Sequence, residues 1–542
     1  MGPRRRDPGA SCSDGDRVSR RRLDDPEAGP NIEYAGWQPP PNRGAPNVVD
    51  RAPAATMSPK TFYDTYVAKR RPVVLTGGLQ GTPWGLCCET WTDKFLVGHP
   101  EGDASVRVET RKDGFGSYGV GKYHPMRFTD FVKRFANGDD SVYLTASPSS
   151  VDAHGRPSVV SAPASFLVGT HRPAKAPFRP KIAGNLVPAN VNLWMGAAGT
   201  EKVSKSGLHH DHHDNLYVLL RGEKKIELFP PSAVLSMYTT GTPCKVHKNG
   251  VINYKETGET AEDGDDGALR RRVLSANVRD AETEVEACEV LVANGEPEAE
   301  ARLRRAEEAL DQAMDGTIGD VGGDDDDDDD DDDDENGAFA GRDDFDDVCD
   351  SDLECVTGTD GEDDGEDEDN LVTNGTDGTE MEGDVVVSGV REDETREEKE
   401  TETENPEPDP PSFSKTSRGG DVSKSFPLFR HARETSMMET TVRAGEIIFL
   451  PAGWFHEVSS SGSGAVKKKE KQNGDDNDAD AKKKNQEGDQ RNTQHAALNY
   501  WFHPPVFGAD FATPYGEKQE MWEQDWSSWE TLFDTEAGRE KP

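Results

Sequence analysis

The sequence predicts a mainly β domain with flanking helices, interrupted by a long acidic insertion. Apolar and polar residues alternate after the histidine cluster in 207–231, an apolar run in 443–458 ends in a turn, and 495–502 follows as a further strand. Hydrophobic residues make up 32% of the 542 positions and charged residues 31%. This proportion of apolar side chains is too low for a chain that is ordered throughout, so we expect a large part of it to be solvated.

The negative charge lies almost entirely in one region. Residues 246–425 contain 61 acidic and 16 basic side chains, a net of −45 against −43 for the whole chain, which leaves +2 for everything else. Eleven consecutive aspartates occupy 324–334. Self-repulsion and the scarcity of apolar residues exclude a packed core there. The region is therefore expected to be a solvated tether or a contact surface for basic proteins.

The remaining elements follow the chain in order. Residues 58–79 are typical of a capped helix followed by a buried strand that ends in two glycines. Strand alternation occurs again in 104–110 and 192–196, and residues 126–136 have helical spacing. Within the insertion, two apolar stripes at three-four spacing are joined by a Gly-Glu-Pro turn and predict a helical hairpin over about 276–315.

These patterns divide the chain into five parts. They are a disordered N-terminal tail (1–55), the first part of the β domain (56–258), the acidic insertion (259–425, disordered from 316), the second part of the domain (426–515, with a flexible loop at 461–492) and a C-terminal helical tail (516–542). In that tail Trp522, Trp526 and Trp529 share one helical face. Such a face predicts either a homodimer contact or packing against the chain's own domain.

Cysteine usage and hydropathy bear on the compartment. The seven cysteines form no CxxC pair and no regular ladder, which predicts free thiols in a reducing compartment. The N-terminal residues lack the apolar core of a secretory signal, and no apolar run is long enough to cross a bilayer. We therefore expect a cytoplasmic or nuclear protein without membrane contact. Direct binding of nucleic acid is not expected.

One short segment is rich in potential metal ligands. Residues 209–214 read His-His-Asp-His-His-Asp and lead into a strand pattern. On a strand, residues i and i+2 share a face, so His209 and Asp211 could reach one ion together. The apolar run before Pro451 ends in a Pro-Ala-Gly turn, and His456 then begins the next predicted strand. Two imidazoles and one carboxylate on one face are typical of non-haem Fe(II) oxygenases.

The spacing of the residues that follow resembles a known family. His212 and Asp214 also stand at i and i+2, so the residues alone leave two registers open. The segment resembles the Jumonji-C branch of the cupin-fold, 2-oxoglutarate-dependent oxygenases, and most closely its small, lysyl-hydroxylase-type members with the pattern H-x-D-x-x-x-N, a Gly, and a Lys fifteen residues after the first His. Counted from His209, Lys224 stands at the last place, whereas the other register places Glu227 there. The resemblance covers about 58–258 and 426–515.

The resemblance implies a fold, a cofactor and a set of site residues. The fold would be a double-stranded β-helix, and the cofactor Fe(II), with 2-oxoglutarate and O2 as co-substrates. A buried dicarboxylate needs a fixed cation and hydrogen-bond donors, which is the physical reason for a lysine at this place. The implied residues are His209, Asp211 and His456 for the metal and Lys224, Tyr143, Ser206, Asn215 and Asn499 for 2-oxoglutarate, with Lys225 as the substitute for Lys224 if the strand is bulged.

The implied activity is hydroxylation of a protein side chain, with lysine as the target type. The same chemistry on an N-methyl group would make the protein a histone or protein N-methyl-lysine demethylase. No cysteine clusters typical of histone-reading modules are present in the sequence, which favours hydroxylation. A third interpretation is a non-catalytic cupin that binds basic proteins through its acidic insertion.

Overall fold

The computed structural model describes nine stretches of the chain, and all of them belong to one unit. They are residues 29–110, 122–145, 158–169, 175–197, 204–265, 267–318, 410–418, 422–460 and 494–538. The predicted loop at 461–492, the aspartate run at 324–334 and the first 28 residues lie outside the described residues.

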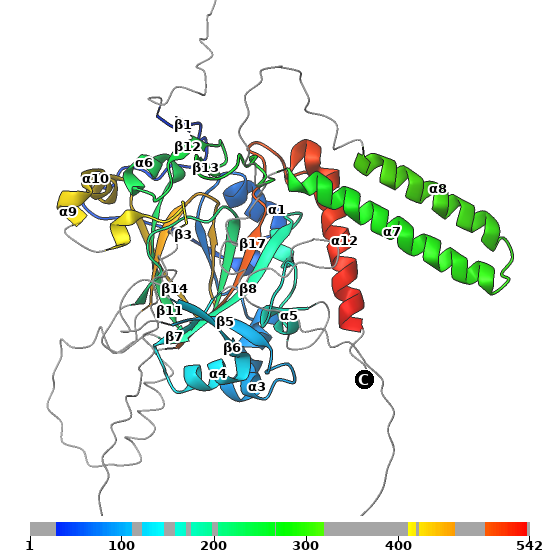
Figure 1. Cartoon of the computed structure of the whole chain (residues 1–542). Coiled ribbons are helices and arrows are strands. Elements are labelled where there is room, and N and C mark those ends of the chain that lie inside the picture. Colours follow the sequence, from blue (N-terminus) through cyan, green and yellow to red (C-terminus); the bar gives the residue numbers. More distant parts are fainter. Residues whose placement is uncertain are drawn as a thin grey trace, which may run out of the picture. The chain divides into compact units, whose positions relative to one another are not determined.

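Two sheets form the centre of the molecule (Figure 1). The nine-stranded major sheet has the order β3 (Asp50–Pro53), β4 (Val73–Thr76), β15 (Ile447–Leu450), β10 (Asp214–Arg221), β17 (Gln494–Phe502), β8 (Pro188–Ala197), β7 (Val142–Leu144), β5 (Ser105–Thr110) and β6 (Lys122–Arg127). The five-stranded minor sheet has the order β2 (Asn47–Val48), β14 (Met438–Arg443), β11 (Glu223–Phe229), β16 (Phe455–Ser460) and β9 (Ser204–Lys205).

The inner faces of the two sheets bury a shared core. Alternate residues of each strand point inward, so Leu219 of β10 and Ile448 of β15 meet Ile226 and Leu228 of β11. The chain crosses from β10 to β11 through Gly222 alone. This residue has φ +85°, and a Cβ there would lie 2.6 Å from the carbonyl oxygen of Gln494, so the crossing requires glycine. The arrangement confirms the expected double-stranded β-helix.

Helices cover the outer face of the major sheet and build the larger core. The first is α1 (Pro59–Phe62), where the Ser58 hydroxyl accepts a hydrogen bond of 3.0 Å from the Thr61 amide, as expected for a capped helix. Phe131 of α4 and Leu193 of β8 lie in this second core. The others on this face are α2 (Pro83–Thr90), α3 (Asp93–Val97), α4 (Phe128–Ala136) and α5 (Ala164–Leu167).

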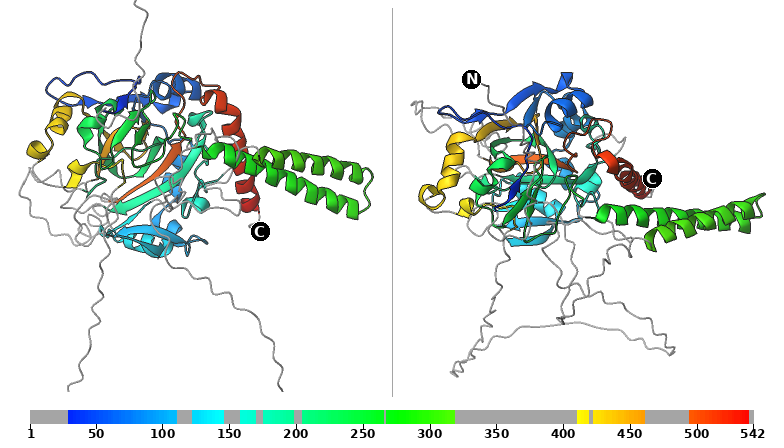
Figure 2. Two further views of the ribbon diagram at one scale, coloured as in Figure 1. Left: turned by 45° about the horizontal axis from the view of Figure 1, so that its top comes forward. Right: turned by 90° about the horizontal axis from the view of Figure 1, so that it is seen from above.

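The predicted helical hairpin is present and longer than expected. Helices α7 (Ala268–Ala293) and α8 (Ala299–Ile318) lie side by side in every view (Figures 1 and 2). The first turns of α7 also pack on α12 (Gln519–Gly538), where the Arg272 guanidinium donates to the Asp525 carboxylate at 3.3 Å. The additional turns lie at the N-terminal end of α7, which is attached to the domain.

The prediction of a disordered tail up to residue 55 is wrong from residue 29 onward. Strand β1 (Asn31–Ile32) pairs with β12 (Pro243–Val246), which in turn pairs with β13 (Ile252–Tyr254). β2 and β3 extend the minor and major sheets. These strands add mainly backbone hydrogen bonds at sheet edges, so their sequence has little apolar alternation to detect.

The predicted limits of the insertion also need correction at both ends. Residues 259–265 lie on the domain, where the Asp263 carboxylate accepts a hydrogen bond of 3.1 Å from the Trp522 indole. Residues 410–418 lie on the domain as well, followed by α9 (Val422–Ser425) and α10 (Pro427–Thr435), so the second part of the fold begins before residue 426. Polar residues at both ends bond to loops, which gives no periodic apolar signal.

The tryptophan face of α12 packs against the chain's own domain. Trp522 is fully buried, and the Trp526 and Trp529 rings stack on Phe178 with centroid distances of 5.1 and 5.6 Å. Of the two predicted roles of this face, the structure shows packing against the chain's own domain. Among the described helices, none is long and apolar enough to span a bilayer.

Candidate metal centre

The three predicted metal ligands converge at one end of the space between the two sheets. His209 and Asp211 lie in the bend before β10, not on the strand itself as predicted. His209 instead forms an isolated antiparallel bridge with His456, the second residue of β16. The His209 amide donates to the His456 carbonyl at 3.1 Å, and the His456 amide donates back at 2.7 Å. One potential ligand atom from each of the three residues lies within 4.8 Å of the others.

The Pro-Ala-Gly turn before β16 holds residues 209–211, which we name the ligand bend, in place. The Gly453 amide donates to the Asp211 carbonyl at 2.9 Å, and the Ala452 amide donates to the Asp214 carboxylate at 2.8 Å. Gly453 has φ +75°, and a Cβ there would lie 1.8 Å from the Gly250 carbonyl oxygen. The turn therefore needs glycine both for its backbone angle and for the close approach of another loop.

Backbone carbonyls fix which nitrogen of each histidine faces the centre. His209 Nδ1 lies 3.1 Å from the Gly207 carbonyl, and His456 Nδ1 lies 2.9 Å from the Trp454 carbonyl. Because a carbonyl accepts only, each Nδ1 carries the proton, which leaves Nε2 with a free lone pair. Each Nε2 lies 3.9 Å from an Asp211 carboxylate oxygen. The Asn215 amide donates to that carboxylate at 3.0 Å.

Electrostatics keep His209 and Asp211 in the protonation states that a metal requires. Burial, together with the neighbouring His456, lowers the pKa of His209 to about 4. Burial alone would raise the pKa of Asp211, but the two histidines and Asn215 outweigh it, and the pKa is lowered. At neutral pH the centre thus offers an uncharged imidazole at His209 and a carboxylate at Asp211.

The alternative register, His212 with Asp214, is excluded by the role of Asp214. Its carboxylate is fully buried in an ion pair with Arg70, whose Nη1 lies 2.8 Å from Asp214 Oδ2. The Arg70 Nε donates in addition to the Asn249 carbonyl at 2.8 Å. Asp214 therefore links the start of β10 to the segment before β4 and faces away from the metal ligands.

The other histidines of the cluster have structural surroundings. His210 is buried, with Nε2 at 2.7 Å from the Tyr254 hydroxyl. His213 stacks on Trp501 at a centroid distance of 6.3 Å and contacts His503 edge-on at 5.4 Å. His210 and His213 thus take part in packing contacts of the domain.

Lys224 lies buried on the inner face of β11. It is four residues from Leu228, which is the partner of His456 between β11 and β16. Its Nζ lies 2.5 Å from the Ser460 hydroxyl, and the two residues are direct partners between β11 and β16. Within the described part of the chain no carboxylate pairs with Lys224, and burial lowers its pKa to about 7. Lys225 points to the other face, where it pairs with Glu439 at 2.9 Å, so the strand is not bulged and Lys224 occupies the predicted place.

Of the two predicted hydroxyl donors, Tyr143 lies beside Lys224, whereas the Ser206 hydroxyl is bonded to the backbone. The Tyr143 ring on β7 is buried beside Lys224, with the ammonium 5.9 Å from the ring centroid. The Ser206 hydroxyl is occupied by the backbone: it accepts from the Val458 amide at 3.0 Å and donates to the Gly207 carbonyl at 2.9 Å. Ser460, which the sequence reading missed, occupies the place next to the ammonium. It could have been found, because His456 and Ser460 stand at i and i+4 on one face of a strand.

Buried amides line the wall opposite Lys224. Asn215 Oδ1, Asn499 Oδ1 and Asn192 Nδ2 are buried, and none of these atoms has a hydrogen-bond partner among the described residues. Asn192 and Asn499 are cross-strand partners on β8 and β17. Unpaired buried polar atoms are costly, so their concentration here indicates a place for a polar ligand. Asn192 was missed, although it precedes Trp194 by two residues and shares its face.

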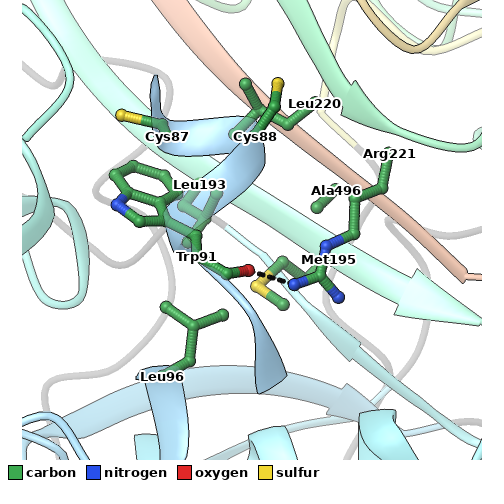
Figure 3. A pocket seen from close by; sticks show the side chains of 9 residues that line it. All are labelled: Cys87, Cys88, Trp91, Leu96, Leu193, Met195, Leu220, Arg221 and Ala496. Atoms are coloured by element: carbon green, nitrogen blue, oxygen red, sulfur yellow. Dashed lines mark hydrogen bonds between the residues drawn. The ribbon is translucent and has the colours of Figure 1, made fainter. Parts of the chain in front are cut away.

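A small crevice lies on the face of β8 and β17 that is opposite to Asn192 and Asn499 (Figure 3). Leu193 and Ala496 line it beneath Cys87 of α2, and the Arg221 guanidinium closes one side by donating to the Trp91 carbonyl. Because Leu193 and Asn192 point to opposite faces of β8, this crevice is separated from the metal ligands by the sheet.

A double-stranded β-helix with two histidines and one carboxylate at one end defines a cupin-class protein. A model of the cupin-like domain family matches residues 59–507, and the chain belongs to that family. JmjC relatives in this family are typically 2-oxoglutarate oxygenases.

Three relatives illustrate the range of similarity. JmjC domain-containing protein 4 of Schizosaccharomyces pombe is 26% identical over 495 residues, 86% of this chain and 87% of the relative. The tRNA wybutosine-synthesizing protein 5 of Danio rerio is 28% identical over 205 residues, 34% of this chain and 56% of the relative. The human bifunctional peptidase and (3S)-lysyl hydroxylase JMJD7 is 24% identical over 184 residues, 32% of this chain and 52% of the relative.

Proposed function

We propose that this protein is an Fe(II)- and 2-oxoglutarate-dependent dioxygenase that hydroxylates a protein side chain, with a lysine-type target. The observation that carries the proposal is the convergence of His209, Asp211 and His456 beside the buried ammonium of Lys224. Neither feature is needed for the stability of a β-helix, and a buried cation without a paired carboxylate is unfavourable on its own. Together they form a site for a metal and a dicarboxylate.

The donor set fits iron. Two Nε2 atoms and one carboxylate oxygen on one side leave the remaining coordination positions open, which is the arrangement of non-haem Fe(II) oxygenases. The carbonyl contacts of both Nδ1 atoms and the Asn215 amide orient the three donors. A site closed by a fourth protein ligand would instead favour structural zinc.

The surroundings fit 2-oxoglutarate. His456 and Ser460 are four residues apart on β16, about 13 Å between their Cα atoms, and the inward side chains of His456 and Lys224 would shorten this span toward the length of a five-carbon diacid. Lys224 would neutralise the far carboxylate, and Ser460 would hold the ammonium in position. When bound, iron and 2-oxoglutarate would supply the chemistry that places one oxygen atom of O2 in a substrate C–H bond, with succinate and CO2 released.

The chain itself would orient the co-substrate and exclude water. The unpaired Asn192 Nδ2 can donate to an entering carboxylate or carbonyl group, whereas Asn215 Oδ1 and Asn499 Oδ1 can accept from a ligand hydroxyl or a bound water. The rings of Tyr143 and Trp194, with centroids 6.1 Å apart, form an aromatic wall on the same side. A dry, preorganised site of this kind strengthens each polar contact to the ligand.

The lysine-type target is supported by one relative, the human bifunctional peptidase and (3S)-lysyl hydroxylase JMJD7. The same site acting on an N-methyl group would remove a methyl group. The products differ, because hydroxylation adds one oxygen atom and demethylation removes one methylene unit.

The experiment compares full-length wild type with His209→Ala and with His431→Ala, a matched control at an exposed histidine of α10. Succinate release is measured with Fe(II), 2-oxoglutarate and ascorbate, and a cell-extract proteome is then read by mass spectrometry for gained oxygen or lost methyl groups. We expect turnover in wild type and His431→Ala and none in His209→Ala. No turnover together with no thermal shift on adding 2-oxoglutarate would favour the non-catalytic binder instead.

A further inference from the structure

The acidic insertion returns to the fold directly beside the metal ligands. Residues 410–416, which we name the exit strap, run between the ligand bend and the loop at 238–241. The Ser414 amide donates to the Leu208 carbonyl at 2.8 Å. On the other side the Thr240 amide donates to the Phe413 carbonyl at 2.7 Å. The exit strap thus contributes backbone pairing on both sides, as a short strand does.

Buried side chains fix the exit strap in one position. The Ser414 hydroxyl is buried, donates to the Met237 carbonyl at 2.5 Å and lies 2.7 Å from the Thr416 hydroxyl. A Cβ at Gly241 would lie 2.5 Å from the Pro411 side chain, so the strap packs closely against that loop. These contacts indicate a built part of the domain and not a segment lying loosely on its surface.

Phe413 places its ring on the imidazole of His209. The ring centroids are 4.8 Å apart with an interplanar angle of 11°, and the two residues form an antiparallel bridge. His209 also contacts Gly207 through Nδ1 and the His456 ring at a centroid distance of 4.4 Å. Phe413 is therefore the contact that defines the plane of the imidazole, while Gly207 sets its rotation within that plane.

We propose that Phe413 is a positioning residue for His209: the exit strap holds the imidazole plane so that Nε2 points toward Asp211 and His456. The inference rests on the proposed metal centre and adds a component to it. The C-terminal end of the acidic insertion is then one of the segments that form the metal site. Loss of a stacked aromatic partner at a ligand is expected to weaken metal binding by about tenfold.

The test uses Co(II) in place of iron, so that the readout is independent of turnover. Co(II) affinity and the d–d absorption spectrum are measured on the full-length protein for wild type, Phe413→Ala, Phe413→Leu and Phe413→Tyr. We expect about tenfold weaker binding and an altered spectrum for the Ala and Leu variants, and wild-type behaviour for Tyr, which restores the aromatic plane. Phe426→Ala is the matched control, because Phe426 contacts the Tyr238 ring edge-on at a centroid distance of 5.0 Å and does not contact a metal ligand. It should leave both readouts unchanged.

The outcomes separate the two proposals. If wild type binds Co(II) no better than His209→Ala does, the metal centre itself is wrong. If wild type binds Co(II) and Phe413→Leu, which keeps most of the side-chain volume, shows the same affinity and spectrum, the positioning role is refuted. The Leu variant covers the case in which Phe413→Ala fails to fold, and thermal melting of each variant identifies that case.

Discussion

The lowered pKa of Lys224 leads to a pH dependence of 2-oxoglutarate binding. Burial lowers the pKa of the free protein's Lys224 to about 7 from an ordinary 10.5, and a bound carboxylate would raise it again. Binding at a pH between these values must therefore take up a proton. The dissociation constant should increase about tenfold for each pH unit above 7, which is about 1.4 kcal/mol per unit.

The assay is calorimetric titration of Mn(II)-loaded full-length protein with 2-oxoglutarate at pH 6.5 and pH 8.5. With a pKa of about 7 for the free lysine, the dissociation constant should increase by about 25-fold over this range. Repeating the titration at pH 8.5 in buffers of different ionisation enthalpy should reveal uptake of about one proton per ligand bound.

Lys224→Arg provides the control, because a guanidinium stays charged throughout this range. Its dissociation constant should be nearly independent of pH, so the difference between the two proteins isolates the lysine from effects of pH on the metal. Equal pH dependence in wild type and Lys224→Arg would refute the reasoning. The folding stability of the ligand-free protein should change with pH in the opposite direction to 2-oxoglutarate binding. Its free energy of unfolding should increase as the pH rises from about 7 toward 10.5, because Lys224 is still protonated in the unfolded chain over this range but not in the folded one.

Three further substitutions test the framework of the site. Asp214→Asn leaves the buried guanidinium of Arg70 without its carboxylate, and chemical denaturation should show a loss of about 3–5 kcal/mol in the free energy of unfolding. Ser460→Ala removes the hydroxyl next to the Lys224 ammonium, and titration should show about tenfold weaker 2-oxoglutarate binding with metal affinity unchanged. Gly453→Ala forces a clash with a carbonyl oxygen at a positive φ, and both the melting temperature and the Co(II) affinity should fall.

The ion-pair and glycine substitutions each have a matched control. Lys60→Met breaks the exposed pair with Asp64 and should change the free energy of unfolding by less than about 0.5 kcal/mol. Gly445→Ala has φ +92° but open space at its Cβ, so it should show the backbone penalty of about 1–2 kcal/mol without loss of Co(II) affinity. If Gly453→Ala and Gly445→Ala behave alike, the close approach of the Gly250 carbonyl has no role in holding the ligand bend.

The sequence predicted the parts of the site that depend on spacing. Asp211 and Lys224 stand at fixed distances along the sequence from His209. The two-residue period of a strand then places the inward residues of β11 on one face. His456 follows a turn whose composition is distinctive. The lysine at the fifteenth place was enough to choose the register that the Asp214 ion pair with Arg70 independently supports.

The sequence could not predict contacts that depend on loop conformation. The Ser206 hydroxyl appeared suitable for a carboxylate, yet it bonds to the backbone of β16, and Ser460 lies beside the ammonium instead. The edge strands before residue 55 and the exit strap have polar, proline-containing sequences, and their stability comes from backbone pairing with distant segments. Composition alone therefore assigned them to disorder.

The position of the exit strap explains how this domain accommodates so long an insertion next to its metal ligands. A wholly flexible loop of the length of 319–409 would cost about 2 kcal/mol more to close than a ten-residue loop. The buried Ser414 and Thr416 hydroxyls, the pairing with the ligand bend and the stack of Phe413 on His209 can offset a cost of that size. Because the same contacts orient a metal ligand, closing the insertion and forming the metal site are energetically coupled. A metal ion bound at His209 should therefore stabilise the docked strap as much as the strap strengthens metal binding.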